Sequence, residues 1–314
     1  MADKSLFRLL DRSDHCIVAP CVYDCASARA VELVGFEAMM LSGGEVSIAM
    51  NGVIDYGFTN LTDVEWITSR ISQTSAIPLA ADIEDGFGGP LAVYRSARRL
   101  AMAGAKALQL EDASDMEEST GLLPREKYYE KVKAALAALE GSDCFLIART
   151  NADPETEMDE GCERMRMAHE LGAQMTTVVK IGTLDHAKHV AQKVPGWKMF
   201  PDVRDIDGKP AVTVDQIYPL GFNLMTMHYT LKAAMDGMLE HGLHNVKQQG
   251  CHYTCQKVDA TGVMGMSATP LFDPQSYMEL ENRFTGGGKE YTIVGNKVEE
   301  FPEGFVRTAI EDRL

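Results

Sequence analysis

The sequence predicts an α/β fold, a (β/α)₈ barrel followed by a C-terminal helical extension. Four glycines, Gly35, Gly104, Gly172 and Gly221, each stand between a helix-like stretch and a short apolar run. A glycine at this point supplies the left-handed residue that ends a helix before the chain enters a strand. Eight such apolar runs alternate with amphipathic stretches along residues 16–227. Eight parallel strands in this length fit one closed barrel better than two open sheets.

The individual elements follow from these junctions. The predicted strands are Cys16–Ala19, Ala38–Leu41, Leu79–Ala81, Ala107–Leu110, Phe145–Ala148, Met175–Val179, Lys198–Phe200 and Leu224–Met227. The amphipathic stretches between them include Asp63–Thr74, Leu91–Ala103, Glu126–Leu139 and Glu155–Leu171, which we predict to be helices.

The chain divides into two parts in this interpretation. Residues 1–240 form the barrel, the catalytic domain, and residues 241–314 form an extension that packs on its own barrel or on a neighbouring subunit. Within the extension, Glu240–Cys255 is helix-like, Thr269–Pro274 is turn-like, and Thr285–Gly288 reads as a break. Tyr291–Val294 is strand-like, and a polar helix ends the chain.

Charge and composition exclude several classes of partner. The formal net charge is −16 and the pI about 4.9, so the surface repels nucleic-acid phosphates and anionic lipid. No apolar run approaches the roughly 20 residues that span a bilayer. The first residues lack the pattern of a secretory signal, so we expect a cytoplasmic protein. An anionic substrate would need a metal or an arginine to attract it.

The seven cysteines predict reduced thiols, because an odd number in a long chain without a secretory signal argues against a disulfide framework. Cys251 and Cys255, with His241 and His244 upstream, are an alternative as a zinc site. Their spacing matches no common zinc module, so the interpretation as small buried hydrophobes is favoured.

In such a barrel the active site lies at the C-terminal ends of the strands. The residues that follow the predicted strands are Tyr23 and Asp24, Ser42–Gly44, Asp82–Gly88, Glu111 and Asp112, Arg149–Asn151, Lys180, Asp202 and His228. Four carboxylates stand out, from Asp55, Asp82, Glu84 and Glu111. Crowded carboxylates repel one another unless a cation neutralises them, and hard oxygen ligands suit Mg²⁺ or Mn²⁺.

Three further features bear on whether these residues form a site or a set of solvated loop acids. Gly86 and Gly88 allow the backbone to approach a ligand closely. Ser42-Gly43-Gly44 offers free backbone N–H groups for a carboxylate or an enolate oxygen, although a simple tight turn explains it equally well. Arg149 ends an apolar run, so its guanidinium must pair with a protein acid or with the substrate; we favour the substrate.

Together these motifs resemble those of the isocitrate lyase/phosphoenolpyruvate mutase superfamily. The likeness runs from about Val18 to Met238. It is carried by Tyr23-Asp24-Cys25-Ala26-Ser27-Ala28, Ser42-Gly43-Gly44, Pro78-Leu79-Ala80-Ala81-Asp82-Ile83-Glu84-Asp85-Gly86-Phe87-Gly88, Leu110-Glu111-Asp112 and Ile147-Ala148-Arg149-Thr150-Asn151-Ala152. The second acid of the signature is Glu84, where the family normally has aspartate.

The resemblance implies a Mg²⁺ site formed by Asp55, Asp82, Glu84 and Glu111. It also implies a 2-oxo acid held by Ser42, Gly43, Gly44, Asp82 and Arg149, and a homotetramer with an exchanged C-terminal helix. Members of the superfamily share a metal-stabilised enolate of a 2-oxo acid. The implied activity is therefore that of a lyase for a small 2-oxo or 2-hydroxy acid resembling oxaloacetate or an alkylmalate. Cleavage of a carbon–carbon bond and decarboxylation both remain open.

Three departures from the family pattern restrict the activity. The carbon–carbon lyases carry a Lys-Lys-Cys-Gly-His loop after strand four, whose cysteine is their acid. Here Ala113–Pro124 is acidic and contains no cysteine, lysine or histidine. The lyases' glutamate near the end of strand six is missing here, replaced around Val179-Lys180. Their asparagine of strand seven is also missing, since that region reads Pro201-Asp202. We therefore do not expect an isocitrate or methylisocitrate lyase.

The missing cysteine leaves the proton donor open. Candidate groups for the catalytic role are Asp55, Tyr23, Arg149 and His228, with Tyr56 or water as further proton donors. Three other activities are compatible with the same motifs. A phosphonate mutase or hydrolase would need a basic loop, a class I aldolase would use Lys180, and a catalytically silent barrel would only bind the 2-oxo acid.

Overall fold

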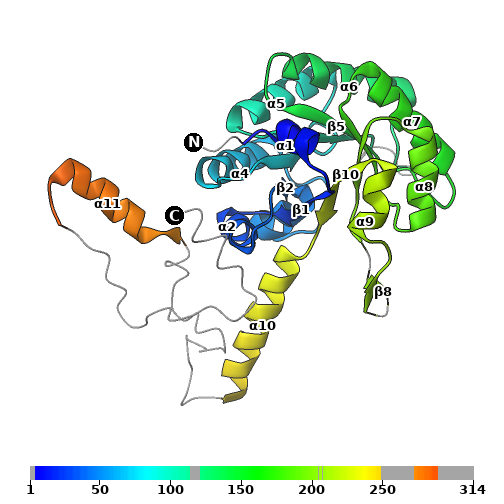
Figure 1. Ribbon diagram of the computed structural model, residues 1–314. Coiled ribbons are helices and arrows are strands. Elements are labelled where there is room, and N and C mark those ends of the chain that lie inside the picture. The colour runs from blue at the N-terminus through cyan, green and yellow to red at the C-terminus, as the bar shows by residue number, and fades with distance from the viewer. Residues whose placement is uncertain (1–3, 114–120, 204, 207, 249–271, 289–314) are drawn as a thin grey trace. The chain divides into compact units, whose positions relative to one another are not determined.

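The structure is a computed structural model that describes residues 4–113, 121–203, 205–206, 208–248 and 272–288 (Figure 1). Eight parallel strands form a closed barrel, in which β1 pairs with both β2 and β10. The strands are β1 (Ile17–Val22), β2 (Met39–Leu41), β3 (Leu79–Asp82), β4 (Ala107–Glu111), β5 (Phe145–Thr150), β6 (Met175–Val178), β7 (Trp197–Phe200) and β10 (Phe222–Met227). All eight predicted strands are present, and the predicted barrel is confirmed.

Helices alternate with these strands along the chain, and those between β1 and β10 lie around the barrel (Figure 1). They are α1 (Leu6–Arg12), α2 (Cys25–Val34), α3 (Gly43–Val46), α4 (Leu61–Thr74), α5 (Pro90–Ala103), α6 (Arg125–Leu139), α7 (Met158–Leu171), α8 (Leu184–Lys193), α9 (Val214–Ile217) and α10 (Thr230–Gln248). A π-helical turn, η1 (Ser47–Asn51), continues α3, and a 3₁₀ turn, η2 (Tyr218–Leu220), precedes β10.

The four junction glycines have the backbone conformation that the sequence predicted. Their φ angles are 98° at Gly35, 112° at Gly104, 117° at Gly172 and 84° at Gly221. At Gly104 a side chain would also meet Ser72, whose Cβ lies 2.5 Å from the position of an added Cβ. Glycine is therefore required there for both conformation and space.

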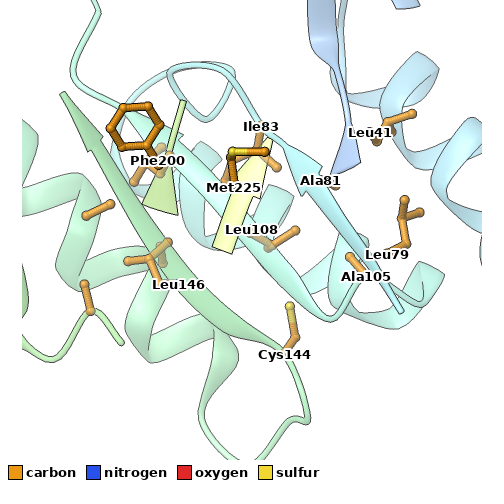
Figure 2. Close-up of a cluster of buried hydrophobic side chains, with 14 of the residues drawn as sticks. Leu41, Leu79, Ala81, Ile83, Ala105, Leu108, Cys144, Leu146, Phe200 and Met225 are labelled. Carbon is orange, nitrogen blue, oxygen red and sulfur yellow. The ribbon is translucent and has the colours of Figure 1, made fainter. Parts of the chain in front are cut away.

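Successive side chains of each strand point to opposite faces of the barrel wall, so the molecule has two hydrophobic cores. One core lies between the strands and the surrounding helices, and Figure 2 shows part of it, including Leu79, Ala81 and Ile83. The other core fills the barrel and contains Ala80, the residue between the first two. This alternation turns Asp82 toward the interior as β3 ends.

Helix α1 closes the N-terminal end of the barrel. Leu6 and Leu10 are buried in the inner core together with inward-facing strand residues such as Ile17 and Phe145. Burial of each leucine contributes about 1.5–3 kcal/mol. The inner core is therefore apolar at its base and polar only at the C-terminal mouth.

Several elements were not predicted. The sequence analysis missed α1, the hairpin of β8 (Asp205–Ile206) and β9 (Lys209–Pro210), and α11 (Pro274–Thr285). Helix α11 does carry a start signal, since Asp273 caps it by accepting a hydrogen bond from the backbone N–H of Ser276 and a proline follows.

The C-terminal part begins within a helix. The chain separates into one compact unit of Met1–Glu32 and Phe36–Leu231 and another of Leu33–Gly35 and Lys232–Leu314. Helix α10 begins ten residues before the predicted helix Glu240–Cys255, and the predicted boundary at residue 240 falls inside it. Cys251, Cys255, Tyr291–Val294 and the predicted final helix lie outside the described residues. No helix in the described part of the chain is long and apolar enough to cross a membrane.

Candidate active site

The centre of the site is an arginine that bridges two carboxylates. Asp82 ends β3, Glu111 ends β4, and Arg149 lies near the end of β5. The guanidinium Nη1 of Arg149 lies 3.1 Å from Asp82 Oδ2, and its Nη2 lies 2.8 Å from Glu111 Oε2. All three side chains are largely buried, so these charge-assisted contacts are little screened by water. Arg149 thus pairs with protein acids, the alternative that the sequence analysis had disfavoured.

Two amides complete this arrangement. Asn151 accepts a hydrogen bond from Arg149 Nε at 3.0 Å and donates one to Glu111 Oε2 at 2.9 Å. Gln109 donates from Nε2 to Asp82 Oδ2 at 3.2 Å. The sequence analysis gave neither residue a role. Gln109 was detectable in principle, because it stands two residues before Glu111 on the same face of β4.

Behind this cluster lies a fully buried aspartate. Asp112 accepts hydrogen bonds from the backbone N–H of Asn151 at 2.8 Å and from Thr150 Oγ1 at 2.7 Å. Arg164, from α7, donates to Asp112 Oδ2 at 3.1 Å and to the carbonyl of Leu123 at 2.9 Å. Asp112 therefore fixes the backbone of Asn151, and Arg164 neutralises the buried charge.

The other two predicted metal ligands lie against the Ser42-Gly43-Gly44 turn. A Cβ added to Gly43 would lie 1.8 Å from Glu84 Oε1, and one added to Gly44 would lie 2.8 Å from Asp55 Oδ2. The two glycines thus leave space for the two carboxylates. Glu84 has a φ of +50°, which is rare for a residue with a side chain. Its buried Oε1 has no hydrogen-bond partner among the described residues.

The turn itself starts helix α3. Ser42 is the N-cap, and its hydroxyl accepts a hydrogen bond from the backbone N–H of Glu45. Gly43 and Gly44 are the first residues of the helix, so their N–H groups have no partner within it. This geometry is compatible with the predicted anion-binding role.

Burial and crowding raise the pKa values of the acids. Burial, followed by the charges of Asp82, Glu111 and Asp55, raises the pKa of Glu84 to about 10. Burial raises the pKa of Glu111 to about 7, although Arg149 opposes this rise. The pKa of Asp82 is also raised by burial, again against Arg149. One arginine is therefore insufficient to ionise all the acids at neutral pH.

These acids fit a divalent cation by their chemistry. In the described part of the chain, no three His, Cys, Asp or Glu side chains are arranged as a closed metal-binding group. Mg²⁺ keeps several water ligands and needs only one or two direct carboxylates, so such a closed group is not required. The unpartnered Glu84 Oε1 and the raised carboxyl pKa values are both relieved by a nearby cation.

The remaining candidates have different environments. Burial raises the pKa of the Tyr23 phenol, and its hydroxyl makes no hydrogen bond to any described residue. Asp55 and Tyr56 lie in an exposed segment after η1. Lys180 lies in an exposed turn after β6. A Schiff-base lysine is normally activated by desolvation or by a neighbouring cation, so its exposure disfavours the aldolase alternative.

His228 belongs to a second polar cluster at the mouth. It follows β10, and its Nδ1 is hydrogen-bonded to Asp202 Oδ2, after β7. Glu45 is buried nearby and accepts a hydrogen bond from Thr230 Oγ1, which also donates to the carbonyl of Cys21. The sequence analysis named Asp202 and His228 separately and did not pair them.

Comparison with known proteins shows the family of this chain. The phosphoenolpyruvate phosphomutase family matches residues 7–246. The chain belongs to this family. A petal death protein of Dianthus caryophyllus is 32% identical over 277 residues, covering 85% of each chain. A 2-methylisocitrate lyase of Aeropyrum pernix is 30% identical over 253 residues, covering 78% of this chain and 80% of the relative.

Solved structures of this family have the same fold. A structure of oxaloacetate acetylhydrolase in complex with oxalate superposes with a TM-score of 0.79 at 26% identity, covering 90% of this chain and 98% of the other. For 2,3-dimethylmalate lyase the TM-score is 0.78, also at 26% identity, with coverages of 89% and 98%. The predicted superfamily is confirmed, and the predicted class of carbon–carbon lyase agrees with these relatives. Most of the divergent loop, residues 114–120, lies outside the described residues.

Proposed function

We propose that this family member is a Mg²⁺-dependent lyase that cleaves a carbon–carbon bond of a small 2-oxo or 2-hydroxy carboxylic acid. The observation that carries the proposal is the bridge from Asp82 through Arg149 to Glu111, beside Glu84 with its unpartnered oxygen. Relatives named oxaloacetate decarboxylase, at 31% identity over 192 residues, and 2,3-dimethylmalate lyase support the substrate class.

Asp82, Glu84, Glu111 and Asp55 would hold the cation, Mg²⁺ or Mn²⁺, some of them through water. When bound, the cation would supply positive charge that attracts the anionic acid and stabilises negative charge on its 2-oxygen. The backbone N–H groups of Gly43 and Gly44 would hold the substrate carboxylate, at the start of α3 beside the Ser42 cap.

Arg149 has two functions in this proposal. In the absence of substrate it lowers the pKa values of Asp82 and Glu111, which keeps them available to a cation. With substrate present, its planar guanidinium would turn to the incoming carboxylate, for which it provides a matching pair of donors. Asn151 would continue to orient it through Nε.

Decarboxylation is the reaction that this site supports best. The electrons of the broken bond move onto the 2-oxo acid, and the resulting enolate needs one proton. Asp55, Tyr23 and His228 are the candidate groups for proton transfer. No cysteine acid is required, which agrees with the acidic sequence that replaces the loop of the carbon–carbon lyases.

The experiment is a panel of oxaloacetate, alkylmalates, 2-methylisocitrate and phosphonopyruvate, assayed for 2-oxo acid products with Mg²⁺ and with EDTA. We expect turnover of a 2-oxo or 2-hydroxy acid that EDTA and Asp82→Ala each abolish. Full activity with either change would refute the metal assignment. Turnover of phosphonopyruvate alone would identify a phosphonate enzyme, and binding without turnover would identify a silent barrel.

We further propose that residues 241–314 pack on a neighbouring subunit of a cytoplasmic homotetramer. Helix α10 exposes Met238, Leu239 and Leu243, and α11 exposes Tyr277 and Phe284. Large apolar side chains of this kind are typical of surfaces that a partner covers. Light scattering should give four times the 34.5 kDa chain mass; a monomeric mass would exclude the assembly.

A further inference from the structure

The loop that follows β3 has a strained backbone. Within Asp82–Gly88, the φ angles are +50° at Glu84 and +63° at Phe87, neither of which is glycine, and +86° at Gly86 and +134° at Gly88. Residues with a side chain rarely adopt this left-handed region, and such conformations persist only where the surroundings hold them. The contacts that hold this loop therefore decide where the Glu84 carboxylate lies.

Hydrogen bonds on both sides of Glu84 hold the loop from within. Asp82 Oδ1 accepts a hydrogen bond from the backbone N–H of Glu84 at 2.9 Å. Asp85 Oδ1 accepts one from the backbone N–H of Phe87 at 2.8 Å. The carbonyl of Glu84 accepts a hydrogen bond from the backbone N–H of Glu111 at 2.9 Å. Asp85, which directly follows Glu84, is thus a second carboxylate that shapes the loop.

Lys131, from the middle of α6, binds Asp85 from outside the loop. Its ammonium Nζ donates to the Asp85 carbonyl at 2.9 Å and to Oδ2 of the same residue at 2.8 Å. Only 9% of the Lys131 side chain is exposed. A lysine is rarely buried to this degree unless its charge is paired, so the ion pair with Asp85 accounts for its burial. One side chain of α6 therefore fixes both the backbone and the carboxylate of the residue next to Glu84.

The influence of Lys131 on Glu84 is positional. The Glu84 carboxylate lies against Gly43, in the loop after β2, whereas the Asp85 carboxylate contacts α6. The largest effects on the pKa of Glu84 come from burial and from the charges of the other cluster acids. The charge of Lys131 is neutralised by Asp85, so Lys131 acts on Glu84 through the backbone that the two neighbouring residues share.

We propose that Lys131 is a positioning residue for the divalent cation, an inference that rests on the proposed function. By holding Asp85, Lys131 keeps Glu84 in its left-handed conformation. The Glu84 Oε1 atom, which has no hydrogen-bond partner in the part of the chain that the structure describes, then stays within the carboxylate cluster. Removal of a residue that orients a metal ligand commonly weakens metal binding by about 10- to 100-fold.

The test is the affinity of the metal-free protein for Mn²⁺, with free Mn²⁺ measured by electron paramagnetic resonance. This measurement does not depend on turnover. Lys131→Met removes both hydrogen bonds to Asp85 and keeps an apolar side chain of similar length. We expect its Kd for Mn²⁺ to rise by about 10- to 100-fold.

Two controls separate this effect from loss of charge and from loss of stability. Lys127→Met removes a positive charge from the same helix, where the lysine is 64% exposed and pairs with Glu130. Leu10→Ala destabilises the fold in the inner core at the opposite end of the barrel. Both control variants should bind Mn²⁺ with wild-type affinity.

Asp85→Asn provides a second measurement if Lys131→Met does not fold. The amide keeps an oxygen for the Phe87 N–H but lacks the charge that pairs with Lys131, so the Kd for Mn²⁺ should again rise. An unchanged Kd in the variant that folds, or an equal rise in Lys127→Met or Leu10→Ala, would overturn the inference and leave the metal site intact. Absence of Mn²⁺ binding by wild type would instead remove the cation from the proposed function.

Discussion

A Cβ atom on residue 43 would lie 1.8 Å from Oε1 of Glu84, so Glu84 occupies its position only because residue 43 is glycine. The two residues come from different loops, one after β2 and the other after β3. The glycine-rich turn therefore shapes the carboxylate cluster as well as offering N–H groups to a ligand. This relationship gives the turn a role that a simple tight turn would not have.

Gly43→Ala should lower kcat/KM about 100-fold, because Glu84 must move by about 1 Å or more. The free energy of unfolding should change by about 1 kcal/mol or less, since the displaced group is the end of a flexible side chain. Steady-state kinetics and urea unfolding measure the two effects. Gly237→Ala is the control, because no atom lies within 4 Å of its added Cβ. Wild-type activity in Gly43→Ala would show that the position of Glu84 is unimportant.

Arg149→Lys should lower kcat/KM by about 100- to 1000-fold, because lysine cannot bridge Asp82 and Glu111 with paired donors. Arg99→Lys is the matched control: Arg99 also bridges a carboxylate, that of Glu65, but on the outer surface between α4 and α5. We expect it to retain full activity. If both variants behave alike in the kinetic assay, the bridge at the site has no special function.

The metal-free protein should lose stability as pH rises. Folding raises the pKa of Glu111 to about 7 and that of Glu84 to about 10, so the folded state binds more protons than the unfolded state above pH 4.5. For Glu111 alone the loss between pH 5 and 8 is on the order of 3 kcal/mol. Mg²⁺ should reverse this loss of stability, because the bound cation replaces the protons on the Glu111 and Glu84 carboxyl groups.

Thermal unfolding between pH 5 and 9, with EDTA and with Mg²⁺, measures this effect. The rise in Tm caused by Mg²⁺ should be larger at pH 8 than at pH 6. An equal rise at both values, or none, would mean that the raised carboxyl pKa values are not coupled to the cation.

Arg164→Met should destabilise the fold by about 3–5 kcal/mol, because it leaves the fully buried Asp112 without its cation. Adding Asp112→Asn to this variant should recover part of the loss. Arg166→Met, two residues along the same helix, removes only half-exposed ion pairs with Glu163 and Glu170 and should cost about 1 kcal/mol or less. Urea unfolding compares the variants, and equal losses for the two arginines would contradict the assignment.

The barrel was predictable because its signals are local. Each helix end needs a left-handed residue and each buried strand needs an apolar run, and both occur within a few positions, as at Gly104 and Ala107–Glu111. Elements without such repetition were missed. Helix α1 has only seven residues, and its function becomes visible only when Leu6 and Leu10 meet the strands.

The sequence predicts which residues form the site, but it does not predict which side chains contact one another there. Strand ends in a parallel barrel share one rim, so Asp82, Glu111 and Arg149 had to be neighbours. Which atoms meet depends on side-chain rotamers and on barrel closure. Arg149 reaches Asp82 across 67 residues of sequence, and Asp202 meets His228 only because β7 pairs with β10.

Helix α1 covers the N-terminal end of a barrel whose interior is filled by side chains, so the proposed site opens only at the C-terminal mouth. Substrate must descend through the C-terminal mouth, and both fragments of a cleaved acid must leave by the same route. In the proposed reaction the products and the next substrate therefore share one route, and a product retained at the mouth would delay the next turnover.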